Sequence, residues 1–261
     1  MTAGNTHSSS AYGTDLAMVH DVGFGGFANG IAPEFIMLLD RYGFRGETVV
    51  DLGCGSGIVA RHLVDSGCQV VGVDISPAMI ELARRRVPEA TFHVDSFRRF
   101  PLPDCAAVTA FGEVLAYQFD AASRPRGLKT FFRKVHSSLR PGGLFVFDLP
   151  EVGLDCDRPP TWSEGDDWTC LVRFETDTRR DQLVRHIVTF VRDGTHFRRQ
   201  QEVHRVQLFR SEEVTSQLRS CGFRVQRARR LGAFPMLPGR VLFTARKSPV
   251  GASRSPKSPG K

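Results

Sequence analysis

The chain has 261 residues, enough for one large α/β domain or two small ones. Its composition, 41% hydrophobic and 24% charged, is typical of a globular protein and excludes wholesale disorder. No apolar run approaches the roughly 20 residues of a membrane helix, and the polar start lacks the apolar stretch of a secretory signal. Six scattered cysteines without a Cys-x-x-Cys pair indicate neither a metal site nor a disulfide framework. These features favour a cytoplasmic protein with reduced thiols and no bound metal.

The formal charge of +7 raises the question of a nucleic-acid partner, because phosphate binding requires clustered cations. Only five of the 35 basic residues are lysines, and Arg254, Lys257 and Lys261 lie in a Ser- and Pro-rich tail. The other basic residues occur in short groups rather than in one block. The charge distribution therefore argues against nucleic acid as the partner.

The two ends of the chain, residues 1–13 and 248–261, are rich in Ser, Pro and Gly and predict disordered tails. Between them, continuous apolar strands alternate with amphipathic helices, which indicates a parallel sheet covered on both faces. The first half predicts strands at 49–52, 69–74, 90–95, 106–111 and 144–149, with helices at 56–65, from Ser76-Pro77 to Val87, and at 126–139.

The pattern changes after Pro150, where the chain lacks a clear helix for about fifty residues. Three antiparallel strands are expected there, and Asp193-Gly194 is a strong hairpin signal between the last two. The α/β pattern then returns, so we expect one domain, residues 14–247, with a β insertion at about 155–209. The expected elements of this half are strands at 168–174, 183–191 and 195–209, a helix from Ser211 to Gly222, and strands at 223–228 and 240–246.

The most informative motif is DLGCGSG, residues 51–57, at the end of the first strand. Glycines there let the backbone turn tightly and approach a ligand, and the following helix start favours a negatively charged group. A dinucleotide-binding fingerprint requires a third glycine where this chain has Ile58. The spacing therefore argues against a nicotinamide-dependent oxidoreductase.

This motif resembles the glycine-rich motif of class I S-adenosylmethionine-dependent methyltransferases. Three further segments agree in order: VVGVDIS with Asp74 ending the second strand, HVDSF with Asp95 ending the third, and LRPGGLFVFD leading into the fifth. The resemblance covers residues 45–150 closely and 211–247 by topology. FGEVLAYQFD after the fourth strand, followed by the β insertion, is similar to the bacterial branch that acts on small molecules. The resemblance implies a Rossmann-like, doubly wound, seven-stranded and mostly parallel sheet, with the insertion capping the active site.

The resemblance also implies roles for individual residues. Gly53, Gly55 and Gly57 would form the turn under the methionine part of S-adenosyl-L-methionine, with Asp51 near its amino group, and Asp74 would accept hydrogen bonds from both ribose hydroxyls. The remaining cofactor contacts implied are Ile75 and Met79 along the adenine, Asp95, Ser96 and Phe97 at its edge and face, and backbone groups of Phe111 and Gly112 at the methionine end.

Substrate contacts are expected beyond the carboxyl ends of the strands. That rule places Glu113 and Tyr117, after the fourth strand, and Asp148, after the fifth, near the transferred methyl group. Glu113 is a candidate to contact substrate or cofactor amine, although a carboxylate at a helix start also has a purely structural use. His20 is a candidate general base within a segment, residues 20–27, that is either a lid or an ordinary covering loop.

The predicted function is methyl transfer to oxygen or nitrogen of a small-molecule acceptor by in-line displacement. The methyl donor is already activated, so the protein mainly aligns the reactants and excludes water. A general base is needed for a hydroxyl or a protonated amine and is dispensable otherwise. The alternatives are a nucleic-acid methyltransferase, which the net charge of +7 suggests although the distribution of charge does not, and a non-catalytic protein that binds S-adenosylmethionine.

Overall fold

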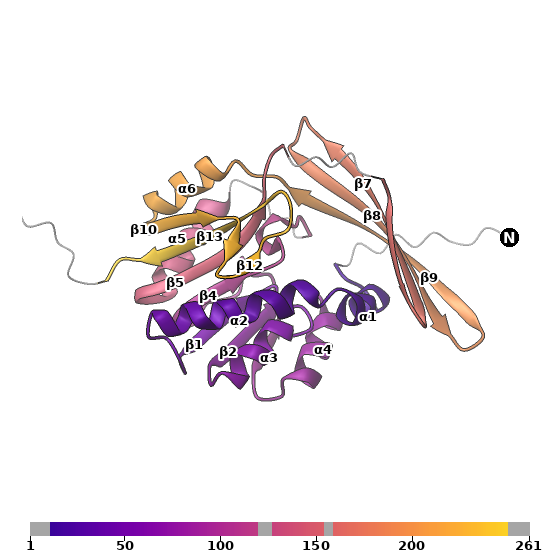
Figure 1. The fold of residues 1–261 in the computed structure, drawn as a ribbon, viewed down its shortest axis with the longest axis horizontal. Coiled ribbons are helices and arrows are strands. Elements are labelled where there is room, and N and C mark those ends of the chain that lie inside the picture. Colours follow the sequence, from indigo (N-terminus) through magenta and orange to yellow (C-terminus); the bar gives the residue numbers. More distant parts are fainter. Residues whose placement is uncertain (1–10, 120–126, 154–158, 250–261) are drawn as a thin grey trace, which may run out of the picture.

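A computed structural model describes residues 11–119, 127–153 and 159–249, which include only the edges of the two predicted tails. At its centre lies a seven-stranded sheet in the order β10-β13-β5-β4-β1-β2-β3 (Figure 1). Only β13 runs antiparallel to its neighbours. The predicted doubly wound, mostly parallel sheet is therefore confirmed. Its strands are β1 (Thr48–Leu52), β2 (Gln69–Asp74), β3 (Thr91–Val94), β4 (Cys105–Ala110), β5 (Leu139–Pro150), β10 (Phe223–Ala228) and β13 (Arg240–Lys247).

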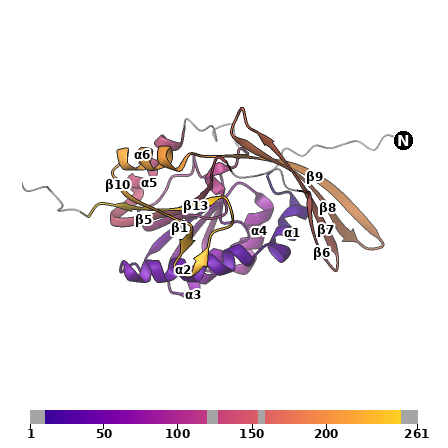
Figure 2. The same cartoon turned by 45° about the horizontal axis from the view of Figure 1, so that its top comes forward.

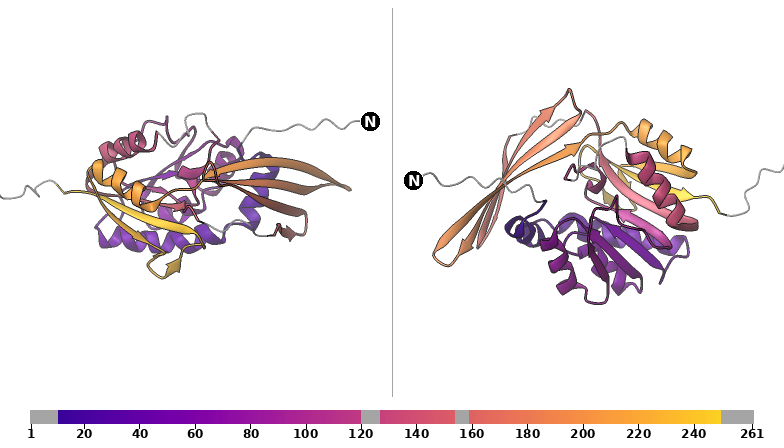
Figure 3. Two further views of the ribbon diagram at one scale, coloured as in Figure 1. Left: turned by 90° about the horizontal axis from the view of Figure 1, so that it is seen from above. Right: turned by 180° about the vertical axis from the view of Figure 1, so that it is seen from behind.

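Helices cover both faces of this sheet, as Figure 3 shows from above and from behind. One face carries α2, α3 and α4, and the other carries α5 and α6. Local sequence explains the starts of two helices: α3 follows Gly57 in a left-handed conformation, and the Ser76 hydroxyl accepts a hydrogen bond from the Met79 amide at the start of α4. The helices are α2 (Gly26–Arg41), α3 (Ile58–Asp65), α4 (Pro77–Arg86), α5 (Leu128–Ser138) and α6 (Ser211–Ser220).

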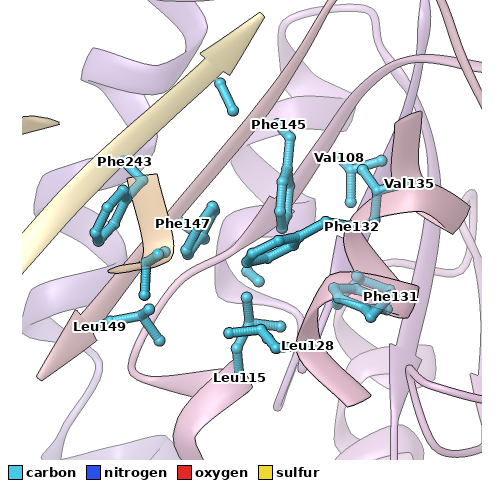
Figure 4. Close-up of a cluster of buried hydrophobic side chains, with 14 of the residues drawn as sticks. Val108, Leu115, Leu128, Phe131, Phe132, Val135, Phe145, Phe147, Leu149 and Phe243 are labelled. Carbon is cyan, nitrogen blue, oxygen red and sulfur yellow. The ribbon is translucent and has the colours of Figure 1, made fainter. Parts of the chain in front are cut away.

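The core beneath α5 and α6 is rich in phenylalanine (Figure 4). Phe132 on α5 is fully buried against Phe145 and Phe147 of β5, and Phe147 stacks on Phe243 of β13 with ring centroids 5.0 Å apart. Such contacts add to the free energy gained from burying large apolar surfaces. This core fixes β5 and β13, whose ends reach the functional site.

The N-terminal part is helical, whereas residues 20–27 were predicted to be a loop or lid. Helix α1 (Thr14–Gly23) and α2 meet at a bend around Phe24 and Gly25. Among the described residues no single helix is long and apolar enough to cross a membrane, and these two meet that test only as a pair bent by 63°. Their buried residues, among them Leu16 and Phe35, belong to the hydrophobic clusters of the protein.

The β insertion forms a separate antiparallel sheet, β6-β7-β8-β9, that projects from the body of the protein (Figure 2). The three predicted strands are present, and a fourth, β6, precedes them. Cys170, Ile187 and Val191 on its inner side pack against α1. The insertion is thus joined to the N-terminal helix as well as to β5. Its strands are β6 (Thr161–Gly165), β7 (Trp168–Asp177), β8 (Gln182–Asp193) and β9 (His196–Gln207).

Candidate active site

A cavity of about 460 Å³ lies at the carboxyl ends of β1 to β4, between the central sheet, α1 and the insertion. In a doubly wound sheet this is where the chain connections reverse direction and ligands bind. Most of the residues singled out from the sequence line it. They are His20, Asp51, Gly53, Gly55, Asp74, Ile75, Met79, Asp95, Ser96, Phe97, Phe111, Gly112 and Tyr117.

Three aspartates end three neighbouring strands in this cavity. Asp74 holds the surrounding loops: its two carboxylate oxygens accept hydrogen bonds from the amides of Gly55 and Ser76, both at 2.9 Å. Burial raises its pKa, while these amide donors act in the opposite direction. Asp95 accepts a hydrogen bond from the Ser96 amide at 2.7 Å and pairs with Arg99.

Asp51 is the least satisfied of the three aspartates. Its side chain is buried, and its Oδ2 atom has no hydrogen-bond partner among the described residues. Burial, with a smaller contribution from the nearby Asp74 charge, raises the pKa of Asp51 to about 8. A buried carboxylate without a partner is costly unless a cation or donor meets it. Asp51 therefore marks the place in the cavity where a cationic group of a ligand would be most stabilised.

The glycines of the motif have different functions. Gly53 and Gly55 line the cavity with left-handed backbone conformations, φ 62° and 53°. A Cβ atom on Gly53 would overlap the side chain of Val114, whereas one on Gly55 would meet no protein atom within 4 Å. Gly57 lies outside the lining, where it starts α3 and packs against Ala83 of α4.

Glu113 and Asp148 do not line the cavity, contrary to the expectation that both contact ligand. Glu113 is 2% exposed and forms ion pairs with Arg185 at 2.7 Å and Arg240 at 3.1 Å. Asp148 is fully buried; it accepts hydrogen bonds from the amides of Gly112 and Glu113 and pairs with Arg240 at 3.3 Å. Burial raises the pKa of Asp148 to about 6, although Arg240 lowers it. Both carboxylates support the wall of the cavity from behind.

The sequence did not point to Arg185 and Arg240, yet both line the cavity. Arg185 extends from β8 of the insertion, and Arg240 begins β13. Arg185 donates a hydrogen bond to the Tyr117 hydroxyl at 3.0 Å, so Tyr117 lies beside a permanent positive charge. Isolated arginines carry no sequence signal, and only their shared contact with Glu113 identifies them.

Tyr12 is a second lining residue that the sequence did not identify, since it lies in the segment predicted to be a disordered tail. The amides of Tyr12 and Gly13 donate to the Glu202 carboxylate at 3.0 and 2.8 Å, and Ser76 Oγ donates to the Tyr12 carbonyl at 2.7 Å. Glu202 also contacts His204, 2.8 Å away. These two residues are buried and hold the N-terminal segment against the insertion.

His20 lies in the cavity wall beside the Tyr12 ring, with centroids 5.3 Å apart. Burial lowers the pKa of His20 to about 4, so the imidazole is neutral at neutral pH and a weak base. Burial also raises the pKa of Tyr12 well above its ordinary value, which keeps the phenol protonated. Both side chains are therefore uncharged at neutral pH.

Comparisons with known proteins agree with this geometry. The profile of a family described as "Methyltransferase domain" matches residues 49–143, the segment that carries the three aspartates and the glycine motif. The dTDP-3-amino-3,6-dideoxy-alpha-D-glucopyranose N,N-dimethyltransferase of Streptomyces fradiae is 27% identical over 93% of this chain and 95% of its own length. The dTDP-3-amino-3,4,6-trideoxy-alpha-D-glucopyranose N,N-dimethyltransferase of Streptomyces venezuelae is 26% identical over 82% of this chain and 92% of its own length.

A solved structure, that of the sugar N-methyltransferase KedS8 from Streptoalloteichus, has the same fold, with a TM-score of 0.76 and 23% identity over 95% of this chain and 99% of that one. Residues 49–143 thus match a methyltransferase domain, and the fold and the relatives of the chain are those of class I S-adenosylmethionine-dependent methyltransferases. The chain is an enzyme that uses S-adenosyl-L-methionine as its methyl donor, and within its class it resembles the bacterial enzymes that act on small molecules.

Proposed function

We propose that this enzyme transfers methyl groups to the amino nitrogen of a small molecule, and that an amino sugar is the class of acceptor that fits best. The observation that carries the choice of nitrogen is the lack of a strong base on the acceptor side of the described cavity. His20 is too weakly basic and Tyr12 too weakly acidic to take or relay a hydroxyl proton at neutral pH. A neutral amine already has a free electron pair and needs no base for the attack.

The relatives support this choice through the part of the chain that they match. The two amino-sugar N,N-dimethyltransferases align over 93% and 82% of the chain, which includes the insertion. By contrast, the malonyl-[acyl-carrier protein] O-methyltransferase of Serratia marcescens aligns over 46% and the ubiquinone O-methyltransferase of Methylobacterium over 38%. Similarity on the acceptor side therefore favours amine acceptors.

The residues present fit S-adenosyl-L-methionine, whose sulfonium makes its methyl group electrophilic. The unpartnered carboxylate of Asp51 suits an α-ammonium group, and the two oxygens of Asp74 retain lone pairs for the ribose hydroxyls. Gly53 and Gly55 form the turn beside which the methionine part would lie, and the space at Gly55 is free of protein atoms. The adenine would lie among Ile75, Met79, Asp95, Ser96 and Phe97, with backbone groups of Phe111 and Gly112 at the methionine end.

The other residues of the cavity orient the acceptor and exclude water. Leu16 and His20 of α1, with Phe24 just after it, form part of the wall, and residues of β7 and β8 that lie next to α1 continue it. We place the insertion as the cap of the acceptor site for this reason. Holding the amine and the methyl donor in line is the main catalytic task of such an enclosure. Instead of contacting the ligand, as predicted, Glu113 and Asp148 would support the cavity wall.

We propose that the enzyme works in the cytoplasm.

The proposal is tested by incubating the enzyme with S-adenosylmethionine and dTDP-3-amino-3,6-dideoxyglucose, followed by mass spectrometry. We expect a product that is heavier by one or two methyl groups. The matched control is dTDP-6-deoxyglucose, which carries a hydroxyl in place of the amine and should remain unmodified. Methylation of the hydroxyl compound, or of no amine in a panel of amino sugars by an enzyme that binds S-adenosylhomocysteine, would refute the assignment to amines.

A further inference from the structure

A chain of hydrogen bonds runs from the insertion to the acceptor side of the cavity. Arg185 on β8 donates through Nη2 to Glu113 at 2.7 Å and through Nη1 to the Tyr117 hydroxyl at 3.0 Å. The Tyr117 hydroxyl lies 3.2 Å from the Tyr12 hydroxyl. Arg185 is 16% exposed in its side chain, and Glu113 is 2% exposed, so solvent competes little for these bonds. The two phenols come from segments 105 residues apart and meet only in the folded protein.

The hydrogen-bond donors and acceptors of Arg185, Tyr117 and Tyr12 can be counted. Arginine has no acceptor, so the Tyr117 oxygen must accept from Arg185. If Tyr12 also donates to Tyr117, the hydrogen of Tyr117 is free and so are the lone pairs of Tyr12. If Tyr117 donates to Tyr12 instead, Tyr12 keeps a free hydrogen and a free lone pair. In both arrangements the two phenols together present one O–H donor and at least one acceptor.

A hydroxyl group satisfies such a pair because it donates and accepts at once. The reacting amine does not, since its single lone pair must face the methyl group. A donor and an acceptor inside a desolvated cavity are also costly when left without partners. The tyrosine pair, which Tyr12 and Tyr117 form, therefore selects for an acceptor with a hydroxyl group in addition to its amine.

We propose that Arg185, held by Glu113, is a positioning residue that fixes the tyrosine pair, and that the pair binds a hydroxyl group adjacent to the methylated amine. The preferred acceptors would then be vicinal amino alcohols. This inference rests on the proposed function because it assumes an amine acceptor. It adds the neighbouring hydroxyl as the feature by which the enzyme distinguishes one amine from another.

dTDP-3-amino-3,6-dideoxyglucose carries a hydroxyl on each side of its amine, at C2 and at C4. Its 2,3,6-trideoxy analogue lacks the first of these hydroxyls, and its 3,4,6-trideoxy analogue lacks the second. We expect the wild-type enzyme to favour the dideoxy sugar over one of the two analogues in kcat/KM by at least about tenfold, because loss of the bound hydroxyl leaves one donor and one acceptor of the tyrosine pair without a partner. Tyr117→Phe and Arg185→Lys should reduce the preference to within about threefold. Arg192→Lys, on the same strand and exposed, is the control and should keep the wild-type preference.

A second measurement needs no acceptor. The chain has three tyrosines, Tyr12, Tyr42 and Tyr117, so 3-fluorotyrosine labelling gives three fluorine resonances that Tyr→Phe variants assign. Arg185→Lys should shift the resonances of Tyr12 and Tyr117 and leave that of Tyr42 unchanged, with circular dichroism as the test of folding.

These measurements separate the two proposals. Equal rates with all three sugars in the wild type, or a preference that survives Tyr117→Phe and Arg185→Lys, would overturn the inference and leave amine methylation intact. If none of the sugars is methylated, the amino-sugar assignment fails and the fluorine spectra decide about the tyrosine pair. Unshifted Tyr12 and Tyr117 resonances in Arg185→Lys would then overturn the positioning role.

Discussion

The raised pKa of the Asp51 carboxyl leads us to expect that cofactor binding depends on pH. In the free enzyme its carboxyl has a pKa of about 8, mainly because it is buried. Pairing with the α-ammonium of the cofactor requires the ionised form, so binding must release the proton. The ionised fraction is about one hundredth at pH 6 and about one tenth at pH 7. The affinity for S-adenosylhomocysteine should therefore rise about tenfold over this interval, about 1.4 kcal/mol, provided the ion pair keeps Asp51 ionised in the complex.

Isothermal titration calorimetry measures both consequences. Titrations at pH 6, 7 and 8 give the dissociation constants, and titrations at pH 7 in buffers with different ionisation enthalpies give the protons released, which should be about one per ligand bound. The control is Asp51→Asn, which keeps the shape of the side chain and removes its titration. In this variant the dependence on pH should largely disappear, and the residual slope reports other groups such as Asp148.

The same variant makes an independent prediction about stability. The folded pKa of Asp51 lies above its ordinary value, so above about pH 4 the carboxyl destabilises the folded, ligand-free enzyme. Asp51→Asn should therefore raise Tm of the free enzyme at pH 7 while it weakens cofactor binding. A dissociation constant that is the same at pH 6 and pH 8 in the wild type, or an equal slope in Asp51→Asn, would refute the pairing of Asp51 with the ammonium group.

Three further substitutions test the site and the core. Asp74→Ala should abolish detectable S-adenosylhomocysteine binding by calorimetry while the circular dichroism spectrum stays unchanged; unchanged affinity would show that Asp74 does not hold the cofactor. Gly53→Ala and Gly55→Ala both strain a left-handed backbone, but Gly53→Ala should lower Tm more because its methyl group also overlaps Val114, whereas Gly55→Ala should weaken binding more relative to its effect on Tm; the reverse order would contradict the assigned roles. Phe132→Ala should cost about 3–5 kcal/mol in denaturant unfolding, and a loss below about 1 kcal/mol would mean that the core collapses around the gap.

The half of the cavity lined by the three aspartates could be predicted because these residues lie at the ends of strands. Asp51, Asp74 and Asp95 each lie at the end of an apolar strand, and the parallel sheet brings those ends together. In this fold, residues at the ends of successive parallel strands therefore lie close together at one edge of the sheet. Asp148 also follows this rule, yet its carboxylate lies behind the cavity, because Gly112 and Glu113 offer it two amide donors there.

The N-terminal helices and β6 could not be predicted from local pattern. Residues 23–30 contain four glycines, which disfavour a helix in isolation. Gly30 is needed because the Phe234 ring packs directly on it, and Pro33 lies inside α2. The strand β6 contains few residues that favour strands and pairs only with β7. In both places tertiary contacts override the preferences of the local sequence.

The half of the cavity next to the insertion, where we propose that the acceptor binds, depends on pairs of residues that are distant in sequence. Glu113 pairs with Arg185, 72 residues away, and Tyr12 is held by Glu202, 190 residues away. The first of these is a buried ion pair and the second a backbone hydrogen bond to a buried carboxylate, and removing either partner would be destabilising. The two halves of the cavity are thus built differently: short motifs form the half lined by the aspartates, and long-range ion pairs and hydrogen bonds form the half next to the insertion. The two amino-sugar N,N-dimethyltransferases match 93% and 82% of the chain, whereas the malonyl-[acyl-carrier protein] and ubiquinone O-methyltransferases match 46% and 38%.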